Sequence, residues 1–293
     1  MINISLLGAG YWGEKVAAEL KNIKDVGNIE IIDIKNGKNI KDIQYDNVII
    51  STPALDHYEQ SINLLKQRKN LYVEKPLAST EQECLEIKKV INNQILMVGH
   101  IFLYNDRLKK IKEIIESGKI GKIKYIESNR LNWGRFQKKI STLLSLAPHD
   151  VSIINYLLGY HEFKNINYKG IKISQHIQND LDTFQFKCAD VDVKLNLSWC
   201  YPEKIRTMVL IGNNGMISWD EEKKTIKVIT DLWQDNWMNY NTKNEILEIE
   251  SNPLKNELEE FVRCIITKNK PFSDIDFAIS IAKNLDLLSK GLP

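Results

Sequence analysis

The chain lacks the features that mark several specialised protein classes. Its 293 residues hold 40 Lys and Arg against 38 Asp and Glu, a net charge of only +2. A nucleic-acid-binding protein normally shows a strong or clustered basic excess, whereas here lysines and acids are interspersed. No stretch approaches the ~20 consecutive apolar residues that a membrane-spanning helix needs. These absences argue against nucleic acid and membrane as partners.

Cysteine is scarce and scattered. The four cysteines form no CxxC pair, and the five histidines share no ligand spacing with them. We therefore expect free thiols in a reducing compartment and no metal site. The first residues run straight into a strand-like apolar stretch without a basic leader, which with the composition favours a cytoplasmic location. The cysteines are Cys84, Cys188, Cys200 and Cys264.

The first part of the chain alternates strand and helix signals. Apolar runs of strand length alternate with segments of helical spacing, which predicts βαβ units and a doubly wound parallel sheet covered on both faces. We place this domain at residues 1–119. The expected strands are 2–7, 29–34, 48–50, 71–73 and 95–98, and the expected helices are 11–22, 54–66 and 80–92.

The pattern changes after a helix expected over 107–117. Along 191–199, apolar and polar residues alternate with period two, which indicates a sheet with one buried face, most often antiparallel. The turn signal Gly212-Asn213-Asn214-Gly215 separates two further strand-like runs, and helices are expected over 254–267 and 275–289. Residues 120–293 are therefore predicted to form a second, α+β domain.

A glycine-rich turn follows the first expected strand. Gly8, Gly10 and Gly13 form a GxGxxG pattern between that strand and a helix, the arrangement that binds the pyrophosphate of a dinucleotide at the helix N-terminus. Asp33 follows Gly13 by 20 residues, where a carboxylate binds the ribose hydroxyls and repels a 2′-phosphate. The spacing predicts NAD as the cofactor, against the alternative of a small-residue turn with a capping Asp.

Two tripeptides end later strands of the same sheet. Ser51-Thr52-Pro53 ends one, with His57 four residues on, and Glu74-Lys75-Pro76 ends the next. Ligands of doubly wound sheets bind outside the carboxyl ends of the strands. A partly desolvated lysine there can polarise or deprotonate a hydroxyl. The alternative is a lysine paired with Glu74 at the surface.

Together these motifs resemble the Gfo/Idh/MocA oxidoreductases. The resemblance continues through Val98-Gly99-His100, Ala147-Pro148-His149-Asp150 and Tyr156-Leu157-Leu158-Gly159, nearly the whole chain. It implies an N-terminal Rossmann domain and an α+β domain with an open, mostly antiparallel sheet, which substrate and other subunits contact. The cofactor-binding residues expected are Gly8, Gly10, Tyr11, Trp12, Gly13, Asp33, Ser51, Thr52, Pro53, His57, Glu74 and Lys75.

The resemblance also implies catalytic roles. Lys75 and His149, the latter expected near a helix start, would flank a substrate hydroxyl beside the nicotinamide. Many members carry an Asp four residues before this histidine, where this chain has Ser145. Asp150 could orient His149 instead.

A closer resemblance points to the branch that acts on nucleotide sugars, such as UDP-N-acetylglucosamine 3-dehydrogenases. It rests on the segments 128–135 and 144–150, and a serine at the position of Ser145 is not anomalous in that branch. Asn129, Arg130 and Arg135 could meet a pyrophosphate or carboxylate, and His100 and Tyr104 follow the last parallel strand as further substrate contacts.

These expectations combine into one reaction. A homo-oligomer (dimer or tetramer) would use NAD to oxidise a sugar hydroxyl to a ketosugar. The hydroxyl expected is that at C3 of a UDP-N-acetylhexosamine, in surface-polysaccharide or lipid A sugar synthesis. Two alternatives stay open, namely a dehydrogenase of a free polyol or inositol and a non-catalytic NAD-binding sensor. Which of Lys75 and His149 is the base is undecided, because two such titrations are coupled.

Overall fold

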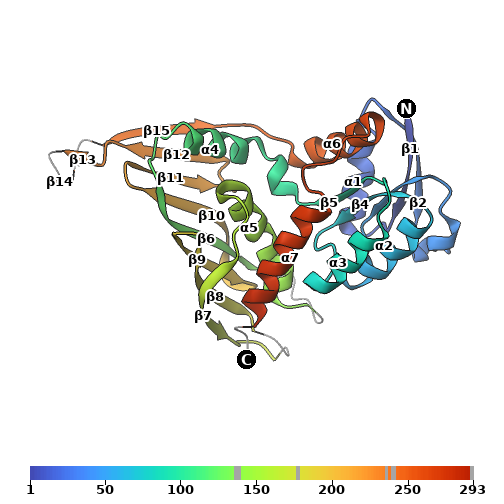
Figure 1. Ribbon diagram of the computed structural model, residues 1–293, viewed down its shortest axis with the longest axis horizontal. Helices are drawn as coiled ribbons and strands as arrows, with labels where there is room; N and C mark the ends of the chain where they lie inside the picture. The colour runs from blue at the N-terminus through green and yellow to red at the C-terminus, as the bar shows by residue number, and fades with distance from the viewer. Residues whose placement is uncertain (135–139, 176–178, 235–236, 239–241, 291–293) are drawn as a thin grey trace. The chain divides into compact units, whose positions relative to one another are not determined.

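The computed structural model describes residues 1–134, 140–175, 179–234, 237–238 and 242–290. Its contacts divide the chain into two units, which are described separately (Figure 1). The first unit joins Met1–Tyr104 to Asn252–Lys283, and the second joins Asn105–Ser251 to the chain from Asn284 on. A domain boundary at residue 119 stays a prediction, and the contact division differs from it in returning residues 252–283 to the first unit.

A five-stranded parallel sheet forms the centre of the first unit. Its order is β2-β1-β3-β4-β5, so the direction of winding reverses between β1 and β3. The predicted doubly wound sheet is confirmed. Its strands are β1 (Ile2–Leu7), β2 (Val26–Ile32), β3 (Asn47–Ile50), β4 (Asn70–Glu74) and β5 (Leu96–Gly99).

The second strand ends earlier than its apolar run predicts. The run continues to Ile34, but Asp33 leaves the strand and its side chain accepts a hydrogen bond from the Lys35 N–H, beginning a short 3-10 helix, Ile34–Asn36. A capping carboxylate therefore overrides the strand propensity of Ile34, which is 86% exposed.

Helices cover both faces of this sheet. α2 (His57–Lys66), α3 (Glu81–Val90) and α7 (Ile275–Ser289) contribute buried apolar side chains to the same core cluster as alternate strand residues. On the other face, α1 (Tyr11–Leu20) contacts α6 (Pro253–Thr267), and Phe261 of α6 packs edge-on against Tyr72 of β4. The near-continuous apolar strands fit burial on both faces.

An eight-stranded sheet forms the second unit, in the order β15-β12-β11-β10-β6-β9-β8-β7. Every neighbouring pair is antiparallel except β6 with β9, which confirms the predicted mostly antiparallel sheet. Its strands are β6 (Ile123–Trp133), β7 (Phe163–Ile171), β8 (Leu181–Cys188), β9 (Val191–Ser198), β10 (Cys200–Gly212), β11 (Gly215–Asp220), β12 (Thr225–Thr230) and β15 (Lys243–Glu248), and β13 (Trp233–Gln234) pairs with β14 (Trp237–Met238) separately.

Two helices of the second unit, α4 (Asp106–Glu116) and α5 (Thr142–Leu158), lie against one face of this sheet (Figure 1). The opposite face carries a polar ladder. Asn196 donates to Asn129 at 2.8 Å and accepts from Thr183 at 3.0 Å. Whether this face joins copies of the chain into an oligomer stays a prediction.

A buried ion pair fixes α5 to the sheet. The Arg130 guanidinium on β6 donates to both oxygens of Asp150 on α5, at 2.7 and 3.2 Å, and the Ser128 hydroxyl donates to the same carboxylate at 2.7 Å. Asp150 is 1% exposed and Arg130 6%. All the donors face one acceptor group, so the carboxylate is fully engaged.

In the part of the chain that the structure describes, no helix combines the length and apolarity needed to cross a membrane.

Removing Asp150 from the buried ion pair should destabilise the fold. We expect Asp150→Ala to lower the free energy of unfolding by about 3–5 kcal/mol, because the Arg130 charge would stay buried without its partner. Urea denaturation measures the change. Asp192→Ala, which breaks the exposed Lys187–Asp192 contact on the same sheet, serves as the control and should barely move the midpoint. Equal effects of the two changes would contradict the structural role of Asp150.

Candidate active site

The glycine turn is built by close backbone contacts. Gly8 has a φ of +94°, and a Cβ placed on it would lie 2.7 Å from the Ser51 carbonyl oxygen. A Cβ on Gly13 would lie 2.1 Å from the Gly8 carbonyl oxygen. Both positions therefore need glycine so that β1, α1 and the end of β3 can approach one another.

Gly10 is glycine for a different reason. A Cβ there would meet no protein atom within 4 Å, so the packing of the fold does not require glycine at this position. Gly10 is also the N-cap of α1, and no side chain caps this helix. Its first N–H groups are thus available to an anion, which a side chain at position 10 would obstruct.

Asp33 is held at the end of β2 with its carboxylate oriented. One oxygen accepts from the Ala9 N–H of the glycine turn at 2.6 Å, and the other accepts from the Lys35 N–H at 2.8 Å. These two backbone hydrogen bonds lower the pKa of Asp33, so it is ionised at neutral pH. An open cradle for phosphate next to a fixed carboxylate fits NAD, the cofactor predicted from the spacing.

His57 joins the ends of β3 and β4. Its Nδ1 lies 2.8 Å from the Pro76 carbonyl oxygen and its Nε2 lies 3.0 Å from the Thr52 carbonyl oxygen. Burial lowers the pKa of His57, and the ring is 1% exposed. The contacts give His57 a role in holding the two loops together, and direct contact with the cofactor stays a prediction, as it does for Ser51 and Pro53.

Glu74 and Lys75 lie next to the glycine turn. The Trp12 indole N–H, in the first turn of α1, donates to Glu74 Oε1 at 2.5 Å, and the Tyr72 hydroxyl donates to the same oxygen at 3.1 Å. Burial raises the pKa of Glu74 to about 7, while the Trp12 hydrogen bond and the Lys75 charge act in the opposite direction. The exposed Tyr11 and the half-buried Thr52, which donates to Gln60 at 2.6 Å, complete the predicted cofactor set.

His100 and Tyr104 follow β5 and are both buried. His100 packs edge-on against Phe277, and burial, with a smaller contribution from the positive charge of Lys75, lowers its pKa to about 3. The Tyr104 hydroxyl lies 3.0 Å from the Ser273 hydroxyl. His100 is thus a neutral imidazole in the electrostatic reach of Lys75, whereas the Tyr104 contact gives that residue a packing role.

The residues expected to bind an anion in the second unit do not act together. Asn129 and Arg130 are neighbours on β6 and point to opposite faces of the sheet, Asn129 into the polar ladder and Arg130 toward Asp150. Arg135 lies outside the described residues. The described geometry thus gives Asn129, Arg130 and Asp150 structural contacts, and their contact with substrate stays a prediction.

His149 lies in the middle of α5. The sequence places it near a helix start, but α5 begins at Thr142, with the Ser141 hydroxyl capping the Leu144 N–H at 3.2 Å. The expectation was wrong because Pro148 resembles a first-turn proline, whereas it lies inside the helix. Ser145 and His149 are four residues apart and share one helix face, and the adjacent Asp150 points to β6.

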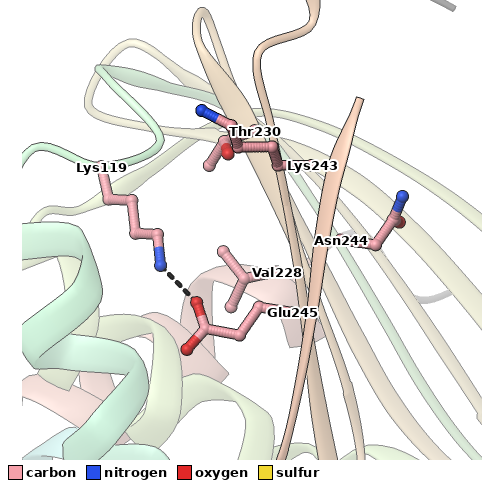
Figure 2. Close-up of a pocket in the computed structure, with 6 residues that line it drawn as sticks. All are labelled: Lys119, Val228, Thr230, Lys243, Asn244 and Glu245. Carbon is pink, nitrogen blue, oxygen red and sulfur yellow. Dashed lines mark hydrogen bonds and ion pairs between the residues drawn. The ribbon is translucent and has the colours of Figure 1, made fainter. Parts of the chain in front are cut away.

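Two cavities of the second unit hold none of the predicted site residues. One, of about 360 Å³, lies at the β12–β15 edge, where the Lys119 ammonium is paired with Glu245 (Figure 2). The other, of about 340 Å³, lies over β7, β8, β9 and β6. The four lysines that line these cavities are each ion-paired, for example Lys243 with Asp231 at 2.9 Å. The candidate site is therefore defined by its side chains rather than by either cavity.

Glu257 was missed by the sequence reasoning. It is 0% exposed on α6, among the charged residues that normally stay outside. A signal was available, because Glu257 interrupts the apolar stripe of this helix and is itself one turn before Phe261.

Comparison with known proteins supports the Rossmann assignment. Residues 2–100 match the family model described as "Oxidoreductase family, NAD-binding Rossmann fold". The chain is 29% identical over 187 residues to a 2,7-anhydro-N-acetylneuraminate hydratase of Escherichia coli, covering 54% of this chain and 50% of that protein. It is 25% identical over 279 residues to a myo-inositol 2-dehydrogenase of Thermotoga maritima, covering 82% and 81%. The chain thus spans about half the length of several curated relatives that it matches.

Solved structures share the whole fold at low sequence identity. A UDP-N-acetylglucosamine 3-dehydrogenase, GnnA, from Acidithiobacillus ferrooxidans superposes with a TM-score of 0.84 at 16% identity, covering 99% of this chain and 97% of that one. A levoglucosan dehydrogenase in complex with NADH and levoglucosan gives 0.81 at 19% identity, covering 99% and 96%. At this identity the likeness shows the fold.

Substitutions of Gly10 and Gly13 can distinguish an effect on cofactor binding from an effect on folding. We expect Gly10→Ala to keep the melting temperature of the wild type and to weaken NAD binding at least about tenfold, because its methyl group meets only the ligand. Gly13→Ala, with its Cβ 2.1 Å from a carbonyl oxygen, should lower both stability and affinity. Calorimetric titration with NAD and thermal melts measure the two effects, and unchanged NAD affinity in Gly10→Ala would contradict the placement of the phosphates.

The glycine turn, the oriented Asp33 carboxylate and the family match coincide on one segment. The resemblance seen in the sequence is confirmed there. Residues 2–100 match the model of the Gfo/Idh/MocA oxidoreductase family, which describes an NAD-binding Rossmann fold.

Proposed function

We propose that the chain is an NAD-dependent dehydrogenase that oxidises a hydroxyl of a sugar or polyol. One observation carries the proposal. The hydrogen bond from Trp12 to Glu74 joins the first turn of α1, where the pyrophosphate would bind, to the residue before Lys75. A lysine fixed next to a nicotinamide cofactor is suited to act on a substrate hydroxyl.

Lys75 and His149 share the proton chemistry in this proposal. One of them accepts the hydroxyl proton while the other stabilises the oxygen as negative charge develops on it. NAD, when bound, supplies the acceptor for the hydride that leaves the carbinol carbon. Lys75 belongs to the first unit and His149 to the second, so their joint action is part of the proposal.

The finer form of the proposal is oxidation at C3 of a UDP-N-acetylhexosamine, as in surface-polysaccharide or lipid A sugar synthesis. It rests on the resemblance of the segments 128–135 and 144–150 to the nucleotide-sugar branch, with Ser145 one helical turn before His149. The name of the GnnA neighbour agrees with that substrate class.

A free polyol or inositol is the second candidate, and a specific contact favours it. Arg130 is already engaged by Asp150, so it is not available to a diphosphate in this arrangement. A neutral polyol needs no such anion site. The myo-inositol 2-dehydrogenase relative, aligned over 82% of this chain, supports the same candidate.

A substrate panel tests the function. The protein, NAD and a set of UDP-N-acetylhexosamines, UDP-hexuronates, free sugars and inositols are mixed, and NADH absorbance is followed. We expect reduction with one class, and we expect Lys75→Ala and His149→Ala each to slow it by about 10²–10⁴-fold, because each removes one partner in proton transfer. Single-turnover measurement is included, since NADH could stay bound.

Lys88→Ala is the matched control, because Lys88 forms an exposed ion pair with Asp276 in the first unit and should keep full activity. Turnover of inositols alone would select the second candidate over the nucleotide sugars. Tight NAD binding with no reduction by any compound would reject the dehydrogenase and support a non-catalytic NAD-binding sensor.

A further inference from the structure

A second carboxyl group lies buried near Glu74 in the first unit, outside the chemistry proposed above. Glu257 of α6 is 0% exposed, and neither of its oxygens has a hydrogen-bond partner among the described residues, because the nearby Tyr72 hydroxyl donates to Glu74 instead. An acid in such a position costs several kcal/mol if it is charged and far less if it is neutral. Its presence in an otherwise apolar helix face calls for an explanation.

Three elements, β4, β5 and α6, surround the pair formed by Glu74 and Glu257. On α6, Phe261 lies one turn after Glu257 and packs edge-on against the Tyr72 ring, with 5.8 Å between the ring centres. On β5, Gly99 is paired with Glu74, and a Cβ on Gly99 would lie 2.5 Å from the Tyr72 hydroxyl oxygen and 3.2 Å from Glu74 Oε2. The absent side chain at position 99 leaves the space that the Tyr72 hydroxyl and the Glu74 carboxyl occupy.

The hydrogen-bond donors are distributed unequally between the two acids. Burial raises the pKa of Glu74 to about 7, and the rise is limited by the Trp12 indole and the Tyr72 hydroxyl, which donate to it, and by the Lys75 charge. Burial and the negative charge of Glu74 raise the pKa of Glu257 well above its ordinary value, against a smaller effect of Tyr72. A single negative charge on the pair therefore resides on Glu74.

We propose that Glu257 is an acid that stays uncharged, so that the Glu74–Glu257 pair presents one negative charge, on Glu74, beside Lys75. This inference rests on the proposed role of Lys75. Glu257 contacts no reacting atom in it, and acts by filling the space over Tyr72 and Glu74 without adding a second charge.

The other titratable groups around the pair are consistent with this arrangement. Tyr72 and Tyr104 are buried phenols whose pKa values burial raises, so both are neutral. His100 is neutral, since its pKa is lowered to about 3 by burial and by Lys75. Among the described residues, Lys75 is thus the cation whose charge acts on the pair.

Stability against pH tests the charge of Glu257 without any substrate. If the pKa of an acid is higher in the folded than in the unfolded state, the protein loses stability as pH rises above the unfolded-state pKa of that acid. Glu257→Gln copies the neutral acid, so its melting temperature should gain on the wild type by about 2 °C per pH unit as the pH rises from about 5. Glu259→Gln, an exposed acid on the same helix, should follow the wild type throughout.

The rate of NADH formation against pH tests which of the two acids carries the charge. In the wild type we expect the rate to fall below pH 7 as Glu74 gains a proton, and Glu257→Gln should keep this profile within about 0.3 pH unit. Glu74→Gln should lose that limb, whereas any limb due to His149 would remain in both variants. If Glu257→Gln does not fold, Glu257→Met gives a neutral side chain of similar length for the same measurements.

Each outcome decides the proposal. A limb that shifts or vanishes in Glu257→Gln would show that Glu257 carries the charge. A stability difference that does not vary with pH would show that Glu257 is only a packing residue. If no compound of the panel is oxidised, the proposed function fails while the stability measurement still decides whether Glu257 is neutral.

Discussion

In the first unit, the indole nitrogen of Trp12 and the carboxylate of Glu74 meet over 2.5 Å. Trp12 lies on α1, the helix that follows β1, and Glu74 ends β4. The two strands are not neighbours in the sheet, because β3 lies between β1 and β4. A carboxylate withdrawn from water is tolerated only where donors satisfy it, and for the half-buried Glu74 the indole and the Tyr72 hydroxyl provide them. The glycine turn, the lysine and the buried acid pair all take their relation to one another from this contact.

Much of the first unit could be predicted from the sequence because its signals are local. Continuous apolar strands, intervening helices and glycines at fixed spacing each reflect short-range geometry, and the structure shows the parallel sheet and the turn that they imply. The second strand shows the limit. Its apolar run extends to Ile34, but the capping carboxylate of Asp33 ends the strand at Ile32.

The remaining features depend on contacts between distant segments. Arg130 read alone is a free cation suited to a phosphate, and only the fold reveals that Asp150, twenty residues on, occupies it. Pro148 read alone suggests a helix start, whereas α5 extends six residues before it. Glu257 was missed because an acid in an amphipathic helix is ordinarily assigned to solvent, although its position in the apolar stripe argued otherwise.

The return of residues 252–283 to the first unit has a practical consequence. Any fragment that stops at residue 119 would carry the whole parallel sheet and the glycine turn but would lack α6, and with it the Phe261 ring that covers Tyr72. Leu258, Val262 and Ile265 of the same helix, all buried, would be missing too. The first half therefore draws its contacts from residues 1–104 and 252–283, so the chain completes this half only after it has built the other.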